Sequence, residues 1–133
     1  MPYINKSLTD NWGTPKNLYE NLNDEFDFDF DPCPYRNDFD GLKIDWKKRN
    51  FVNPPYSNIK DWAKKCRDEQ KKGNLSVLLI PPRTDTKYFH EYIYKYAELR
   101  FIKGRLKFQN LEKPKEKPKP APIPSMLCIF RGF

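Results

Sequence analysis

The apolar residues of this chain recur at helical spacing in three stretches. The first follows Thr14-Pro15, a typical helix start, and predicts a helix over residues 15–24 with Thr14 as its N-cap. The second follows Ser57 and predicts an amphipathic helix that stops at Gly73. The third predicts a helix capped by Asp85 or, as the stronger candidate, by Thr86. Their apolar stripes are Leu18, Tyr19 and Leu22; Ile59, Trp62, Ala63 and Cys66; and Phe89, Tyr92, Ile93, Tyr96 and Ala97.

Other stretches alternate or are continuously apolar, as strands do. Residues 26–31 alternate phenylalanine with aspartate, which predicts a strand with the aromatic rings on one face. Residues 42–46 alternate over a shorter length and predict one short strand. The apolar run 75–80 is typical of a buried parallel strand, and the runs 99–102 and 125–130 predict two more. Strands separated by helices predict an α/β fold.

The composition bounds the size of the fold and suggests a kind of partner. The chain has 133 residues, which predicts a single domain with one core. Lys and Arg number 25 against 18 Asp and Glu, a net charge of +7, and aromatic residues make up 16%. A polyanion with rings to stack on, such as nucleic acid, fits both properties, although small soluble proteins that bind nothing anionic can carry the same charge.

Two segments lack a hydrophobic period. Residues 1–13 predict an arm or loop, and the lysine- and proline-rich residues 111–124 predict a flexible loop. The three cysteines lie far apart without a C-x-x-C pair and there is one histidine, so neither a metal site nor a disulfide framework is expected. Without an apolar signal segment or a run long enough to cross a membrane, the cytoplasm is the expected location.

The sequence Asn53-Pro54-Pro55-Tyr56 follows a short apolar run. Because a proline follows Asn53, its backbone is held extended and the preceding strand ends there. The prolines have fixed φ and no N–H, so the carbonyl oxygens in this segment are preset acceptors. The side-chain oxygen of Asn53 and the carbonyl of Pro54 would accept both hydrogens of a planar –NH₂ group, and Tyr56 would stack on the ring that carries it. A strand-ending turn with a packed tyrosine is the structural alternative.

This arrangement suits a specific reaction of an exocyclic amine. Such an amine is a poor nucleophile, because its lone pair is delocalised into the ring. Acceptors placed where positive charge grows on the nitrogen stabilise the transition state more than the ground state, so no titrating base is required. The electrophile needs a good leaving group, and the sulfonium methyl of S-adenosylmethionine fits.

Five motifs, in this order along the chain, resemble the small phage-type DNA N6-adenine methyltransferase family. The central one is similar to the Asn/Asp/Ser-Pro-Pro-Tyr/Phe/Trp motif of amino-group methyltransferases. The resemblance implies a compact three-layer, Rossmann-like class I methyltransferase fold with a reduced number of strands, spanning residues 1–133. The five motifs are Trp12-Gly13-Thr14-Pro15, Asp31-Pro32-Cys33, Phe51 to Ser57, Pro82 to Thr86, and Gly104 to Phe108.

The same resemblance implies methyl transfer from S-adenosylmethionine to adenine N6 in DNA, with the base flipped out or met in a single strand. Asn53, Pro54, Pro55 and Tyr56 would be the catalytic residues. Asp45 is a candidate for the ribose hydroxyls of the cofactor, with a solvated carboxylate as the alternative. The other cofactor contacts would be Thr14, Pro15, Asp31, Pro32, Cys33 and Asn53. The nucleic-acid contacts would be Arg83, Thr84, Lys87, Arg105 and Lys107.

The chain departs from the family pattern directly after Cys33, where the acidic loop Asn37-Asp38-Phe39-Asp40-Gly41 stands in place of the glycine-rich cofactor loop. Two alternatives therefore stay open. The same chemistry serves the planar –NH₂ groups of RNA bases and of a protein glutamine. The missing glycines would also suit a catalytically inactive nucleic-acid-binding module. The target sequence and the oligomeric state cannot be read from the chain.

Overall fold

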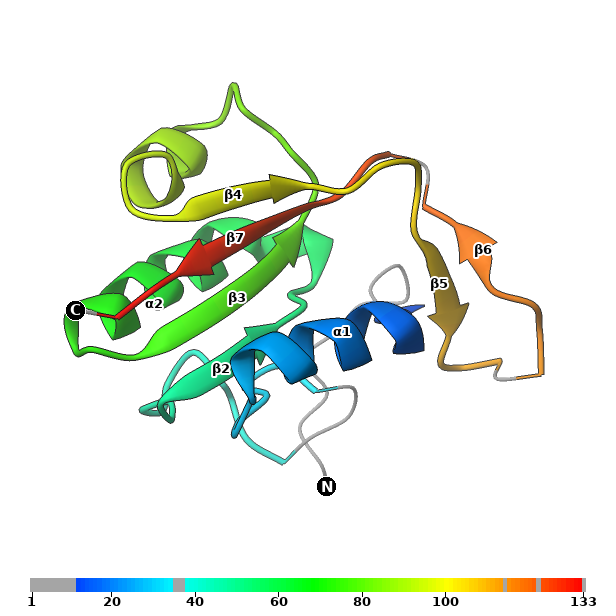
Figure 1. The fold of residues 1–133 in the computed structure, drawn as a ribbon, viewed down its shortest axis with the longest axis horizontal. Coiled ribbons are helices and arrows are strands. Elements are labelled where there is room, and N and C mark those ends of the chain that lie inside the picture. Colours follow the sequence, from blue (N-terminus) through cyan, green and yellow to red (C-terminus); the bar gives the residue numbers. More distant parts are fainter. Residues whose placement is uncertain (1–11, 35–37, 114, 122, 133) are drawn as a thin grey trace.

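Helices cover both faces of a small mixed sheet in the computed structural model, which describes residues 12–34, 38–113, 115–121 and 123–132. Residues 1–11 of the predicted N-terminal arm lie outside the described residues. Figure 1 shows the central sheet and a smaller sheet beside it. The helical elements are α1 (Lys16–Phe26), the 3₁₀ turn η2 (Tyr56–Asn58), α2 (Ile59–Lys71) and the π-helix η3 (Phe89–Ile93).

The central sheet has the strand order β2-β3-β7-β4. Its strands are β2 (Arg49–Val52), β3 (Leu75–Ile80), β4 (Glu98–Phe101) and β7 (Met126–Phe130). β2 and β3 run parallel, while β7 is antiparallel to both β3 and β4, so β4 points the same way as β3. The predicted strands at 75–80, 99–102 and 125–130 are therefore confirmed to within one residue.

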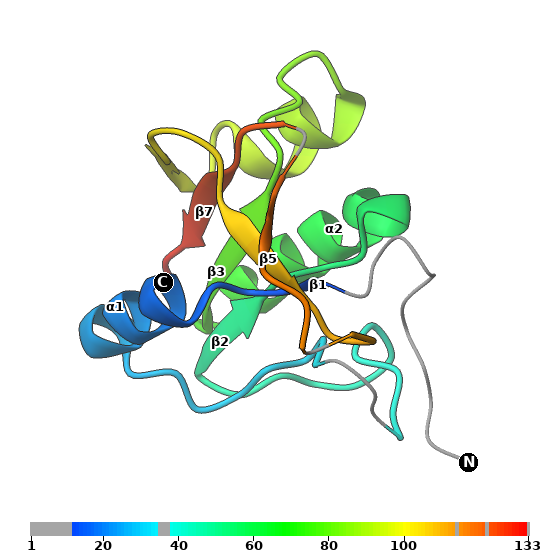
Figure 2. The ribbon, with the colours of Figure 1, turned by 90° about the vertical axis from the view of Figure 1, so that its right-hand side faces the viewer.

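Successive strand residues enter two core clusters on opposite faces of the sheet. α2 covers one face, where Trp62 packs in a cluster with Leu78. α1 covers the other, where Leu22 packs in a cluster with Leu79. Figure 2 shows the two helices on opposite sides of the strands. The predicted α/β class is confirmed.

Both predicted amphipathic helices form where they were expected. α1 begins one residue later than predicted, because Pro15 rather than Thr14 takes the N-cap position, and no side chain caps the first turn. α2 begins directly after η2 and ends before Gly73, whose φ of 91° is left-handed. Cys66 is buried, as predicted for a core residue, and burial raises the pKa of its thiol.

The third predicted helix is shorter than its apolar stripe. Only Phe89 and Ile93 of the stripe are fully buried, while Tyr96 is 38% exposed. Thr86 caps the start of this helix as predicted, because its Oγ1 accepts the N–H of Phe89 at 3.3 Å and donates to the Arg83 carbonyl at 2.8 Å.

The predicted strand at residues 26–31 is wrong. Phe26 instead continues the buried face of α1. Asp27 then adopts a left-handed conformation with a φ of 52°, and its N–H donates back to the last turn of α1. Beyond this point Phe30 makes an isolated bridge to β2, and Phe28 and Phe30 pack against opposite core clusters instead of sharing a face.

The predicted strand at residues 42–46 is also wrong. This segment is a loop packed over α2, with Leu42 and Ile44 half-buried and Trp46 buried. The indole Nε1 of Trp46 donates to the carbonyl of Gly41 at 2.7 Å, and its ring stacks on a tryptophan of α2. The alternation therefore comes from packing on a helix and not from pairing in a sheet.

The smaller sheet contains part of the lysine- and proline-rich segment. Its strand order is β1-β5-β6, with both pairings antiparallel. The segment predicted as a flexible loop, 111–124, includes β6, and Ala121 N–H donates to the Leu106 carbonyl at 2.7 Å. The three strands are β1 (Trp12–Gly13), β5 (Lys107–Asn110) and β6 (Lys119–Pro120).

In the described residues, no helix is both long and apolar enough to cross a membrane.

Candidate functional site

The segments that follow the parallel strands meet at one edge of the central sheet. Because β2 and β3 are parallel, Asn53 and Pro81, which follow them, lie at the same edge. Phe30 bridges Asn50 in the parallel sense, so Asp31 continues toward this edge as well. We call it the carboxyl edge, and in Figure 1 it is where the arrowhead of β3 ends.

Asn53 is held by a residue from the segment that precedes α1. Its Nδ2 donates a hydrogen bond of 2.9 Å to Oγ1 of Thr14. Among the described residues, no donor is assigned to Oδ1 of Asn53 or to the Pro54 carbonyl. The Pro55 carbonyl, by contrast, accepts the N–H of Asn58 at 3.1 Å. Two oxygen acceptors from consecutive residues thus stand ready for a donor at this edge.

Tyr56 opens onto a cavity of about 470 Å³. Its side chain is 40% exposed, while Pro54 and Pro55 are buried. The cavity lies between the start of α2 and the loop after β3, and its size is within the range of small-molecule sites. Asn53 lies three residues before Tyr56 and does not line this cavity. The lining includes Tyr56, Lys60, Pro81, Arg83, Tyr88 and Ile123.

Four of these lining residues were not predicted as site residues from the sequence: Lys60, Pro81, Tyr88 and Ile123. Lys60 belongs to α2 and lies one turn after the proline motif. Tyr88 is half-buried, and burial raises the pKa of its phenol. Ile123 comes from the segment before β7, and no local signal connects it with the motif. A search for polar residues one turn after each motif would have found Lys60 but not Ile123.

The loop from Asp31 to Cys33 turns sharply at the carboxyl edge. Oδ1 of Asp31 accepts the N–H of Cys33 at 2.9 Å, and Cys33 is 2% exposed, within the cluster under α2. Burial raises the pKa of Tyr19 on α1, and the nearby Asp31 carboxylate adds to the effect. The loop therefore presents its backbone and a carboxylate, whereas the Cys33 thiol packs in the core.

Gly41 packs directly against this loop. A Cβ atom at Gly41 would lie 1.9 Å from the carbonyl oxygen of Pro32 and 2.8 Å from the ring of Trp62. Only glycine allows so close an approach of two backbones. Gly41, the one glycine of the acidic loop 37–41, thus packs against the backbone of the Asp31 to Cys33 loop, although the other glycines of the family's cofactor loop are missing.

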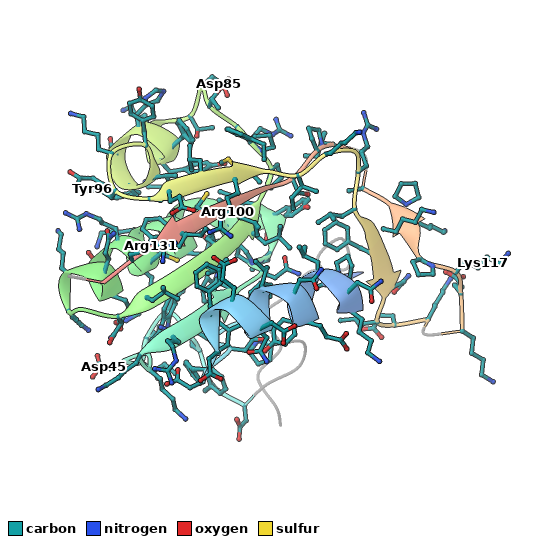
Figure 3. All side chains as sticks on the ribbon, in the orientation of Figure 1. Asp45, Asp85, Tyr96, Arg100, Lys117 and Arg131 are labelled. Atoms are coloured by element: carbon teal, nitrogen blue, oxygen red, sulfur yellow. The ribbon has the colours of Figure 1, made fainter. Side chains whose placement is uncertain are left out.

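Asp45 does not join the other predicted cofactor residues. It lies at the opposite edge of the sheet, where it forms an ion pair of 3.0 Å with Lys72, just before β3. A hydrogen bond from Lys72 lowers the pKa of Asp45. Figure 3 shows the labelled Asp45 far from Lys117, on the opposite side of the molecule. Its position suits a solvated, ion-paired carboxylate, the alternative considered for it above.

The predicted nucleic-acid residues are distributed over two exposed segments. Thr84 contributes a carbonyl that lies 2.8 Å from Nε2 of His90, which holds the loop after β3 against η3. All five predicted nucleic-acid contacts reach the surface, with Thr84 beside Arg83 and Lys87 in the first segment and Arg105 beside Lys107 in the second.

Within the described residues, no group of three His, Cys, Asp or Glu side chains could hold a metal ion.

A small α/β sheet with acceptors and a cavity at its carboxyl edge is compatible with a methyltransferase-like fold. The model of the family described as DNA N-6-adenine-methyltransferase (Dam) matches residues 3–133, and the chain belongs to this family. Family membership makes the protein an enzyme of the DNA adenine N6-methyltransferase class. No curated protein and no solved structure was found to match the chain.

Proposed function

We propose that this chain transfers a methyl group from S-adenosylmethionine to the N6 amino group of adenine in DNA. The observation that carries the proposal is the acceptor pair formed by Oδ1 of Asn53 and the carbonyl of Pro54. Thr14 occupies the amide nitrogen of Asn53, which leaves the amide oxygen for a substrate. Family membership supports adenine in DNA as the source of the amine.

The two acceptors would bind both hydrogens of the adenine amine. As the nitrogen bonds to the methyl carbon it gains positive charge, and the acceptors stabilise this charge more than the neutral ground state. Removing one such group typically lowers the rate about 100- to 1000-fold. The methylated nitrogen then loses one proton to water, so the reaction needs no titrating base.

S-adenosylmethionine would supply the methyl group on a sulfonium, which is a good leaving group. Thr14 and Pro15 lead into α1, whose first turn has neither a side-chain cap nor an acidic residue. The N–H groups of this turn suit the carboxylate of the methionine part. Asp31, Pro32 and Cys33 would line the rest of the cofactor site at the carboxyl edge, as ligands do in open α/β sheets. The same placement supports a reduced, Rossmann-like class I fold.

Adenine inside a duplex is out of reach of the acceptor pair, so the base must be flipped out or met in a single strand. The half-exposed ring of Tyr56 would stack on it, and the adjoining cavity offers room for part of the nucleotide. Arg83, Lys87 and Arg105 are exposed and would contact phosphates or base edges. Thr84 and Lys107 lie beside them and complete the proposed contacts.

Transfer of radiolabelled methyl from S-adenosylmethionine onto DNA, RNA and protein, measured in parallel, tests the proposal. Label is expected on DNA and, after digestion, on N6-methyladenine. Asn53→Ala is expected to abolish transfer while leaving the thermal unfolding midpoint nearly unchanged, because the side chain is only half-buried. Full activity of that variant would refute the role of Asn53.

A thermal shift with S-adenosylmethionine separates the remaining alternatives. A ligand that binds only the folded chain raises its unfolding midpoint. No shift at millimolar cofactor, together with DNA binding, would point to an inactive binding module. Label on RNA or on protein glutamine in place of DNA would show that the substrate is another planar amine.

A further inference from the structure

Most of the net positive charge of the chain comes from one segment. Residues 103–120, which we call the basic arm, contain seven Lys and Arg and two Glu, a net charge of +5 out of the +7 of the whole chain. All seven cationic side chains are exposed. They are Lys103, Arg105, Lys107, Lys113, Lys115, Lys117 and Lys119. A surface of this kind attracts polyanions strongly.

The base of the basic arm is fixed to the rest of the molecule. Phe108 and Ala121 are 6% and 5% exposed and belong to the core cluster under α1. β5 pairs with β6 on one side and with β1 on the other. The lysines beyond this base project from the molecule, and Figure 3 shows the labelled Lys117 at its far end. A fixed base and a charged tip suit an arm that reaches along a large ligand.

The basic arm is joined to the acceptor pair through β1. Gly13 of β1 pairs with Gln109 of β5, and the next residue, Thr14, accepts the hydrogen bond from Asn53. The arm therefore leaves the molecule beside the carboxyl edge, next to the residues proposed to receive the target base. Figure 1 shows β5 and β6 beyond this end of β3, and in Figure 2, which faces that end, they lie in front of the central sheet.

The outer edge of the basic arm is unsuited to a protein partner that adds a strand. β6 is the edge strand of the smaller sheet, and it consists of Lys119 and Pro120. Proline has no N–H to donate to an added strand, and lysine on an edge disfavours pairing. The charge is thus available for a polyanion and not for strand addition.

We propose that the basic arm binds the phosphate backbone of the double-stranded DNA beside the target adenine. This inference rests on the proposed function, because DNA lies beside the arm only if the neighbouring site receives DNA. Its lysines supply affinity and orientation without reading sequence. The arm thereby enlarges the surface with which this small protein contacts the duplex.

Fluorescence anisotropy of a labelled duplex with the full chain tests this inference. The variant Lys115→Gln, Lys117→Gln, Lys119→Gln removes three charges from the arm. Its matched control, Lys48→Gln, Lys71→Gln, Lys95→Gln, removes three charges from exposed lysines that precede β2, β3 and β4 at the opposite edge. The arm variant is expected to bind about tenfold more weakly or worse, with a salt slope smaller by about 2 to 3. The control is expected to bind nearly as the unmodified chain does.

Four results would overturn the proposal. These are unchanged binding by the arm variant, an equal loss in the control variant, tighter binding of the unmodified chain to RNA or to anionic lipid vesicles than to the duplex, and no binding to the duplex at all. Anisotropy needs no methyl transfer, so a chain that binds through its arm but transfers nothing would refute only the proposed function. In an active enzyme, the arm variant should raise KM for DNA and leave kcat unchanged.

Discussion

Thr14 and Asn53 lie 39 positions apart in sequence, yet Nδ2 of Asn53 donates a hydrogen bond of 2.9 Å to Oγ1 of Thr14. The contact connects the segment before α1 with the segment after β2. It restrains the plane of the Asn53 amide and occupies its nitrogen. Thr14 therefore positions Asn53, in addition to any contact of its own with a cofactor.

Thr14→Val tests this positioning role, because valine keeps the shape of threonine and removes the hydroxyl. A lost hydrogen bond of about 0.5–1.5 kcal/mol predicts a fall in kcat of about two- to tenfold. Thr14→Ser, which keeps the hydroxyl, should retain most of the activity. Steady-state kinetics check both variants. A change confined to KM for S-adenosylmethionine would instead assign Thr14 to cofactor binding alone.

Tyr56 offers a test of stacking on the target base. Its side chain is 40% exposed, so its removal should affect the free energy of unfolding little. Stacking of about 1–3 kcal/mol predicts that Tyr56→Ala lowers kcat/KM by about five- to 150-fold. Tyr56→Phe keeps the ring and should lose much less. Equal losses in the two variants would show that the hydroxyl matters and the ring does not.

Gly41→Ala should destabilise the fold and disturb the Asp31 loop. The new Cβ would lie 1.9 Å from the Pro32 carbonyl oxygen, so one of two backbones must move. We expect a loss of more than about 2 kcal/mol in urea unfolding, together with a smaller thermal shift on adding S-adenosylmethionine. Lys43→Ala, at an exposed position of the same loop, is the control. A stable Gly41→Ala variant would contradict the close approach.

Glu69 predicts a pH dependence of stability. Its carboxylate is fully buried; burial alone would raise its pKa, but hydrogen bonds from Asn74, Lys72 and Lys65 outweigh this, so the pKa lies below its ordinary value of 4.5. A lowered pKa in the folded state stabilises the fold above pH 4.5, and this stability is lost as pH falls through the lowered pKa.

Glu69→Gln tests this network. At pH 7 the variant should unfold with about 1–3 kcal/mol less free energy than the unmodified chain, because three donors lose their charged acceptor. The difference should shrink at acidic pH, when the native carboxyl is protonated. Urea unfolding at several pH values measures it. A difference that stays constant with pH would show that the charge of Glu69 is not responsible.

The sequence predicted those elements whose pattern was long or strongly apolar. α2 and β3 formed as expected. A helical stripe of four apolar residues predicts α2, and a run with five apolar residues out of six predicts β3, so few other structures are possible for either segment. The alternation at residues 26–31 predicted a strand that does not form, because Phe26 fits equally well as the last apolar residue of α1. At 42–46 the alternation was produced by a loop packed on α2. Short periodic segments do not determine which neighbour they pack against.

The candidate site was predictable in part. Asn53 to Tyr56 and Asp31 to Cys33 lie at the expected edge, because chain direction alone places residues after parallel strands. Two features of the site could not be predicted. The hydrogen bond from Asn53 to Thr14 and the contribution of Ile123 to the cavity depend on how distant segments pack, and the spacing of residues along the sequence does not encode that packing. Asp45 lies at the opposite edge of the sheet because the strand predicted at residues 42–46 does not form.

The basic arm leaves the central sheet after β4 and returns at β7, two strands that pair directly, and the N–H of Ile102 donates to the Ser125 carbonyl at 3.2 Å where it does so. The two ends of this excursion are thus neighbours. Doubling the length of such a loop costs only about 0.6 kcal/mol in closure entropy. The part of the excursion beyond β5 can therefore be lengthened, shortened or given other charges while β1 and the carboxyl edge stay in place, so evolution can change the affinity for DNA without rebuilding the site.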